Sequence, residues 1–80
     1  MKVSRRMFID EYNTICKEHL KKKSKLSDLT DHELFIWIAG QTVKFGRDFK
    51  ASLENAKCLM QDRQKAEKLF SLENVDLLNY

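Results

Sequence analysis

Residues 34–39 read LFIWIA, six apolar side chains in a row. Successive residues of an α-helix are about 100° apart, so these six side chains would point in every direction around the helix axis. A core on one side of the helix cannot cover them all. A chain of 80 residues builds only a small core. The run therefore requires a helix that is covered on at least two sides.

The rest of the chain is typical of an all-α protein with a single domain over residues 1–80. It contains no proline, two glycines and no alternating apolar pattern long enough to predict a strand. Apolar residues make up 42% and charged residues 34%, which indicates a folded chain rather than a disordered one. No stretch has the length of a membrane span or the pattern of a signal peptide, so we expect a cytoplasmic protein.

Apolar spacing of three and four residues predicts a first helix over about residues 4–23, with Ser4 as its N-cap and a lysine-rich outer face. A polar connector, residues 23–31, follows this helix. The connector ends in a helix-start signal, because Thr30 and Glu33 have the spacing of a capping box. Leu29 and Leu34 have the spacing of the hydrophobic staple that often accompanies such a box.

The second helix is predicted to begin at Asp31 and to extend to about residue 68. Its apolar stripe stays within one arc of about 120° in projection; the stripe consists of Leu34, Ile38, Phe45, Phe49, Leu53, Ala56, Leu59 and Met60. A straight helix of this length would measure roughly 60 Å, about twice the diameter of a compact domain of this size. We therefore expect either a bend or break, most readily at Gly46, or a projecting helix that pairs with another chain. Ser71 predicts a short last helix over about residues 72–79.

A second apolar patch lies opposite this stripe in projection and consists of Ile36, Trp37, Ala39, Gly40 and Val43. Gly40 at its centre would let another backbone approach closely. One interpretation is that the chain covers the patch itself, with the first helix on one side of the central helix and the C-terminal residues on the other. The alternative is that the patch contacts another chain, either in a homodimer or in a protein partner, with Trp37 as the anchor.

The positive charge is concentrated in the N-terminal third. Residues 1–27 hold eight Lys or Arg against three acids, whereas residues 28–80 hold seven against nine. A basic strip on the first helix would bind phosphates without reading sequence. The candidate nucleic-acid contacts are Arg5, Arg6, Lys17, Lys21, Lys22, Lys23 and Lys25.

No motif in the chain indicates a reaction, a metal or a cofactor. The possible metal ligands are Cys16, His19, His32 and Cys58, but only Cys16 and His19 lie one helical turn apart, and structural zinc sites normally have two such pairs. The two cysteines are expected to be reduced. We expect no enzyme and no small-molecule substrate, because two histidines on a short helical chain without a glycine-rich loop give little from which to build a catalytic pocket.

The stretch LTDHEL, residues 29–34, resembles the segment that opens the third helix of the small haemolysin expression-modulating proteins of bacteria. Those proteins are all-helical regulators that bind a nucleoid-structuring protein, so the resemblance implies a regulator that acts through a protein partner. Their typical Ala-Asp-His-Arg motif is replaced here by residues 40–44, GQTVK, and no site residue is carried over. Our leading hypothesis is a microbial or phage-encoded adaptor or regulator that binds a protein. The alternative is a DNA-associated transcription or nucleoid modulator that uses the basic N-terminal helix.

Overall fold

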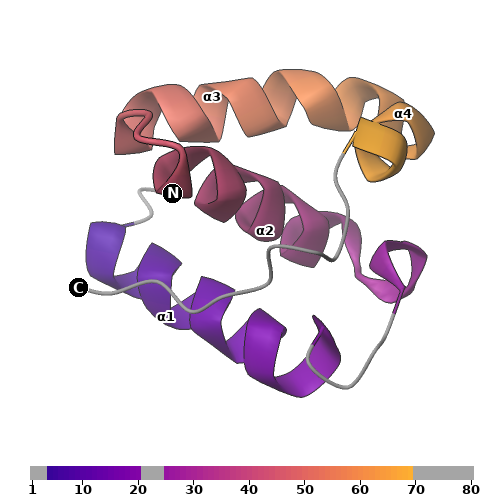
Figure 1. Cartoon of the computed structure of the whole chain (residues 1–80), viewed down its shortest axis with the longest axis horizontal. Coiled ribbons are helices and arrows are strands. Elements are labelled where there is room, and N and C mark those ends of the chain that lie inside the picture. Colours follow the sequence, from indigo (N-terminus) through magenta and orange to yellow (C-terminus); the bar gives the residue numbers. More distant parts are fainter. Residues whose placement is uncertain (1–3, 21–24, 70–80) are drawn as a thin grey trace.

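A reversal of the chain at residues 45–48 organises the fold. The computed structural model describes residues 4–20 and 25–69, and its helices are α1 (Arg5–Ile15), α2 (Asp31–Lys44), α3 (Phe49–Leu59) and α4 (Arg63–Leu69). α3 packs along one side of α2 and α1 packs along the other (Figure 1). The described residues include no strand, and the predicted all-α class is confirmed.

α1 begins where the sequence predicts. The Ser4 side chain accepts a hydrogen bond of 3.2 Å from the backbone N–H of Met7, which confirms Ser4 as the N-cap. The α-helix proper ends at Ile15 and continues as a π-helical turn, η1 (Cys16–Leu20). Residues 21–23, the last of the predicted first helix, lie outside the described residues.

The predicted capping box at the start of α2 is confirmed. The backbone N–H of Thr30 donates to Glu33 Oε1 at 2.9 Å, and the N–H of Glu33 donates to Thr30 Oγ1 at 3.1 Å. Leu29 and Leu34, the predicted staple, are both buried. The hydrogen bond from the Thr30 backbone lowers the pKa of the Glu33 carboxyl below its usual value of 4.5, and nearby His19 lowers it further, while partial burial opposes both effects.

This lowered pKa predicts acid sensitivity at the start of α2. A carboxyl group whose pKa is lower in the folded state stabilises the fold above its unfolded pKa, and that contribution is lost as the pH falls through the folded pKa. We expect thermal unfolding temperatures of the wild type to decline below pH 4.5 more steeply than those of Glu33→Gln, whose neutral side chain still accepts the Thr30 hydrogen bond. Parallel declines in the two proteins, measured by circular dichroism, would contradict this assignment.

The central helix breaks at Gly46, one of the alternatives that the sequence left open. Gly46 has φ of +90°, a left-handed conformation that favours glycine. After the break Asp48 caps α3, since its carboxylate accepts hydrogen bonds from the N–H groups of Lys50 at 3.2 Å and Ala51 at 3.4 Å. A continuous helix to residue 68 therefore does not form. A 3₁₀ turn, η3 (Met60–Asp62), separates α3 from α4, and the predicted helix at 72–79 lies outside the described residues.

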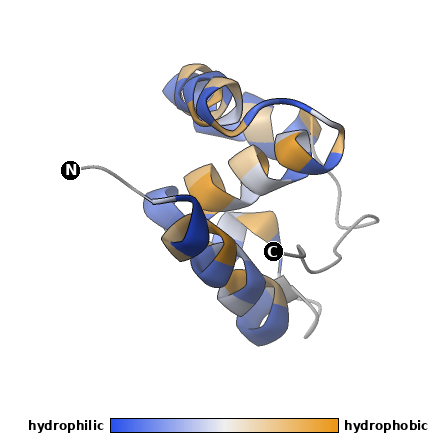
Figure 2. Cartoon of the chain, turned by 90° about the vertical axis from the view of Figure 1, so that its left-hand side faces the viewer, coloured by the Kyte–Doolittle hydropathy of each residue, from blue (hydrophilic) through white to orange (hydrophobic). Residues whose placement is uncertain are grey.

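α2 is the centre of the core because it is covered on two sides. Its hydrophobic stretches lie between α1 and α3 (Figure 2). The core also takes apolar side chains from α1, from the connector and from α3 and α4; its largest buried residues are Phe8, Tyr12, Leu34, Ile36, Trp37 and Ile38. The six apolar residues at 34–39 are thus accommodated within one chain.

Candidate interaction surface

The patch predicted from residues 36–43 is mostly core. Ile36, Trp37, Ala39 and Gly40 lie in the interior, and the three side chains among them are 0% exposed. The interaction hypothesis required these residues to be exposed, and for these four that expectation is wrong. Val43, the fifth residue of the patch, is half-buried. The physical reason is that α1 and α3 together leave no open side on this part of α2.

Tyr12 of α1 fills the space at Gly40 that the sequence left open for a partner helix. A Cβ atom on Gly40 would lie 2.9 Å from Tyr12 Cγ and closer still to two other ring carbons, so only glycine fits beneath the ring. Gln41 Nε2 donates a 2.8 Å hydrogen bond to the Tyr12 hydroxyl, and the Lys44 ammonium lies 5.0 Å from the ring centroid. α1 is therefore matched to this stretch of α2 by shape and by polar contacts.

The candidate nucleic-acid residues are only partly described. Arg5, Arg6, Lys17 and Lys25 are exposed, and none forms an ion pair with a carboxylate in the described part of the chain. Lys21, Lys22 and Lys23 lie outside it. Arg5 and Lys17 are about 18 Å apart along the helix at about 1.5 Å per residue. Arg5 and Lys17 therefore lie near opposite ends of the first helical segment.

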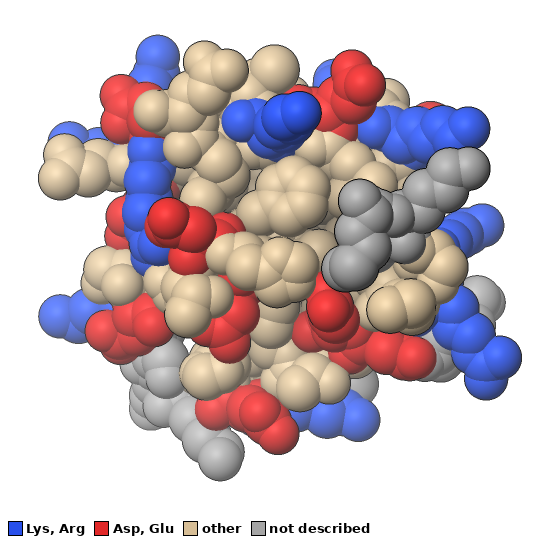
Figure 3. All heavy atoms as spheres, turned by 180° about the vertical axis from the view of Figure 1, so that it is seen from behind, with Lys and Arg blue, Asp and Glu red and all other residues tan. Residues whose placement is uncertain are grey.

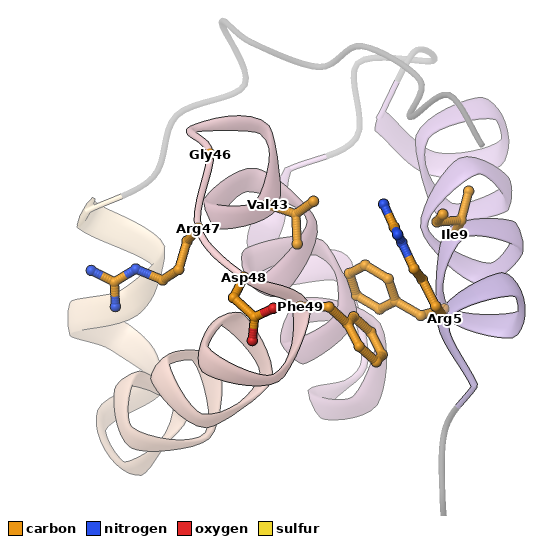
Figure 4. Close-up of a pocket in the computed structure, with 8 residues that line it drawn as sticks. Arg5, Ile9, Val43, Gly46, Arg47, Asp48 and Phe49 are labelled. Carbon is orange, nitrogen blue, oxygen red and sulfur yellow. The ribbon is translucent and has the colours of Figure 1, made fainter.

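A pocket of about 250 Å³ lies between the start of α1 and the turn that joins α2 to α3 (Figure 4). The rings of Phe8 and Phe49 pack there with centroids 5.2 Å apart and planes tilted by 59°. The full lining is Arg5, Phe8, Ile9, Val43, Gly46, Arg47, Asp48 and Phe49. These side chains come from α1, from the end of α2 and from the start of α3, so the helix packing itself shapes the pocket.

The charges around this pocket are predominantly positive. In the view of Figure 4 the Arg5 guanidinium ends between Val43 and Ile9, whereas Arg47 points away from the pocket. The Asp48 carboxylate is directed to the start of α3, where it serves as the N-cap. The lining carboxylate is thus engaged by backbone N–H groups, and neither arginine pairs with a carboxylate among the described residues.

Phe45 directly precedes the lining residue Gly46 in the sequence, and its side chain is 75% exposed. The sequence placed Phe45 in the buried stripe, but the break at Gly46 removes it from the core. Aromatic residues are enriched at protein interfaces relative to the rest of the surface. We call Arg5, Val43, Phe45, Arg47 and Phe49 the turn surface. The signal that would have located it is the sequence FGRD, which combines a turn glycine with an N-cap directly after an aromatic residue.

The histidines serve to join α1 and η1 to the start of α2. His19 Nε2 lies 3.0 Å from Glu33 Oε2, and His32 Nε2 lies 3.2 Å from Glu11 Oε2. Seen from behind, acidic and basic side chains both border a patch of uncharged residues (Figure 3). Across residues 4–20 and 25–69 no three His, Cys, Asp or Glu side chains gather as metal ligands would. Cys16 is buried and Cys58 is exposed, and no disulfide joins them.

None of the described helices combines the length and the apolar character needed to cross a membrane. Comparisons of the chain with protein-family models, with curated proteins and with solved structures found no match. The resemblance over residues 29–34 therefore remains a prediction.

Proposed function

We propose that this chain is a small, non-catalytic adaptor or regulatory protein that binds a partner protein through the turn surface. The observation that carries the proposal is Phe45, which is 75% exposed and directly precedes Gly46 and Arg47 of the pocket lining in the sequence. Burying an aromatic side chain of this kind contributes strongly to association, and Trp, Tyr and Arg are likewise enriched among residues that dominate interfaces.

The hydrogen bonding of the turn between α2 and α3 favours the same function. Phe45 lies between α2 and the glycine turn, and Asp48 ties the other end of that turn to α3 through two hydrogen bonds. A surface held in one conformation loses little conformational entropy when a partner binds. The turn surface therefore combines an exposed aromatic side chain, Phe45, with a backbone turn that is already hydrogen-bonded before a partner binds.

Photo-crosslinking tests this proposal. Benzoylphenylalanine at position 45, in extracts of the organism that encodes the chain, is expected to give a discrete adduct with one protein. The matched control places the same residue at Leu69, which is also exposed, at 59%, but belongs to α4. Adding Arg47→Glu to the position-45 protein is expected to reduce the yield of the adduct. Equal labelling from both positions, or no adduct from position 45, would disprove the proposal.

A second candidate function, DNA binding, is favoured by the exposed cations Arg5, Arg6, Lys17 and Lys25. If these residues contact phosphate, affinity for duplex DNA will fall steeply with salt, with a log–log slope of about 0.9 for each phosphate neutralised. Replacing Arg5, Arg6 and residues 21–23 by alanine is expected to flatten that slope, whereas Lys65→Ala on α4 is expected to leave it unchanged. The absence of DNA binding at about 50 mM salt eliminates this candidate.

A further inference from the structure

We propose that the partner segment bound by the turn surface is an acidic peptide. One of its apolar side chains enters the pocket, and its carboxylates lie to either side of that residue, one facing Arg5 beside the pocket and another reaching Arg47, which points away from it. This inference rests on the proposed function and specifies the chemistry of the partner. It follows from the size of the pocket, the charges around it and the burial of its rings.

The size of the pocket selects a single side chain. Its volume of about 250 Å³ lies below the range of about 300–1,000 Å³ that is usual for pockets holding drug-sized molecules. Phe8, Ile9, Val43 and Phe49 supply apolar walls from three helices. An aliphatic or aromatic side chain matches these walls, and burying it would supply most of the affinity.

The charges around the pocket select carboxylates. The exposed cations of this end of the molecule are Arg5, Arg6, Arg47 and Lys50, and none forms an ion pair with a described carboxylate. Asp48, which is engaged as an N-cap, is the one carboxylate in the pocket lining, so it offsets only part of this positive charge. Exposed ion pairs contribute little affinity, typically below about 1 kcal/mol each, so these cations set the choice of partner and the association rate.

The burial of the aromatic rings favours a peptide over a nucleic acid. A base needs an exposed ring face on which to stack. Phe8 is 1% exposed and Phe49 is half-buried against it, so both rings form walls rather than stacking platforms. Phe45 has an exposed ring but is not part of the pocket lining, so a base stacked on it would leave the pocket empty.

Selection from a displayed library of random 12-residue peptides tests the inference, with the full chain as bait. We expect enriched peptides to combine Asp or Glu with Leu, Met or Phe. Their affinity is expected to fall at least tenfold for the double variant Arg5→Glu, Arg47→Glu and for Phe45→Ser. These changes are at exposed positions, so they should leave the fold intact, as circular dichroism would verify. Lys65→Glu, an exposed charge reversal on α4, is the matched control and is expected to have no effect.

Amide chemical shifts locate the binding site of a selected peptide. The largest changes are expected at Phe8, Val43 and Phe49. Peptides without an acidic bias, or shifts confined to other faces, overturn the inference. The inference is also overturned if duplex DNA binds more tightly than the selected peptides and the same double variant abolishes that binding. It is likewise overturned if sedimentation shows a homodimer that Phe45→Ser dissociates. A partner crosslinked at position 45 together with non-acidic selected peptides would refute the inference alone, whereas the absence of a crosslinked partner would refute the proposed function.

Discussion

Gly40→Ala is expected to lower the free energy of unfolding by about 3 kcal/mol, at the upper end of the usual cost of overpacking. The added methyl group would meet three carbons of the Tyr12 ring. That ring is fully buried and its hydroxyl accepts a hydrogen bond from Gln41, so it cannot move aside cheaply. A core of this size supplies only roughly 3–5 kcal/mol, and the variant is therefore expected to be close to unfolded at room temperature.

The sign of this effect is diagnostic because helix propensity predicts the opposite result. Alanine is favoured over glycine inside an exposed helix by about 1 kcal/mol. Urea unfolding followed by circular dichroism measures the difference directly. Gly46→Ala is the matched control: no atom lies within 4 Å of the added Cβ, so only the left-handed backbone opposes it, at about 1–2 kcal/mol. A Gly40→Ala protein as stable as the wild type would show that α1 does not pack on Gly40 as described.

Local signals in the sequence predicted where α1 and α2 begin. Ser4 and the pair Thr30 and Glu33 act through hydrogen bonds to residues three positions away, so their effect is legible without the tertiary structure. Gly46 was likewise identified as the weakest point of the central helix. A left-handed conformation costs glycine little, and that property belongs to the residue itself.

The partners of the second apolar face could not be predicted because they depend on tertiary packing. Periodicity separated Ile36, Gly40 and Val43 from the main stripe, but it did not show that Tyr12 would lie on Gly40. The same limit explains the misplacement of Phe45. A projection onto one continuous helix assigned it to the core, whereas the reversal at Gly46 keeps Phe49 in the core region and leaves Phe45 in solvent.

The attachment of α4 depends on one side chain that the sequence did not single out. Arg63 donates hydrogen bonds to the carboxylate of Asp31 and to that of Glu67, the latter at 3.3 Å. It also donates to backbone oxygens of the connector: those of Leu26 and Ser27, each at 3.4 Å, and that of Leu29. The hydrogen bond to Asp31 raises the pKa of Arg63 above its ordinary value. A planar guanidinium presents its N–H groups in a fixed fork that reaches several oxygens at once, with three of these oxygens sharing one Nη, whereas an ammonium group has only three donors on a single nitrogen.

Arg63→Ala is therefore expected to destabilise the protein by about 2 kcal/mol, because hydrogen bonds from a charged donor each contribute about 1.5–3 kcal/mol and are not additive. Arg63→Lys keeps the charge but loses the fork of donors, so we expect it to recover less than half of that loss. Arg47→Ala, at an exposed position without an ion pair in the described chain, is expected to change stability by less than about 0.5 kcal/mol. Hydrogen exchange distinguishes a local effect from a general one: in Arg63→Ala the amides of α4 should lose protection before those of α2. Equal stability of Arg63→Ala and Arg47→Ala would show that the hydrogen bonds of Arg63 do not hold α4 in place.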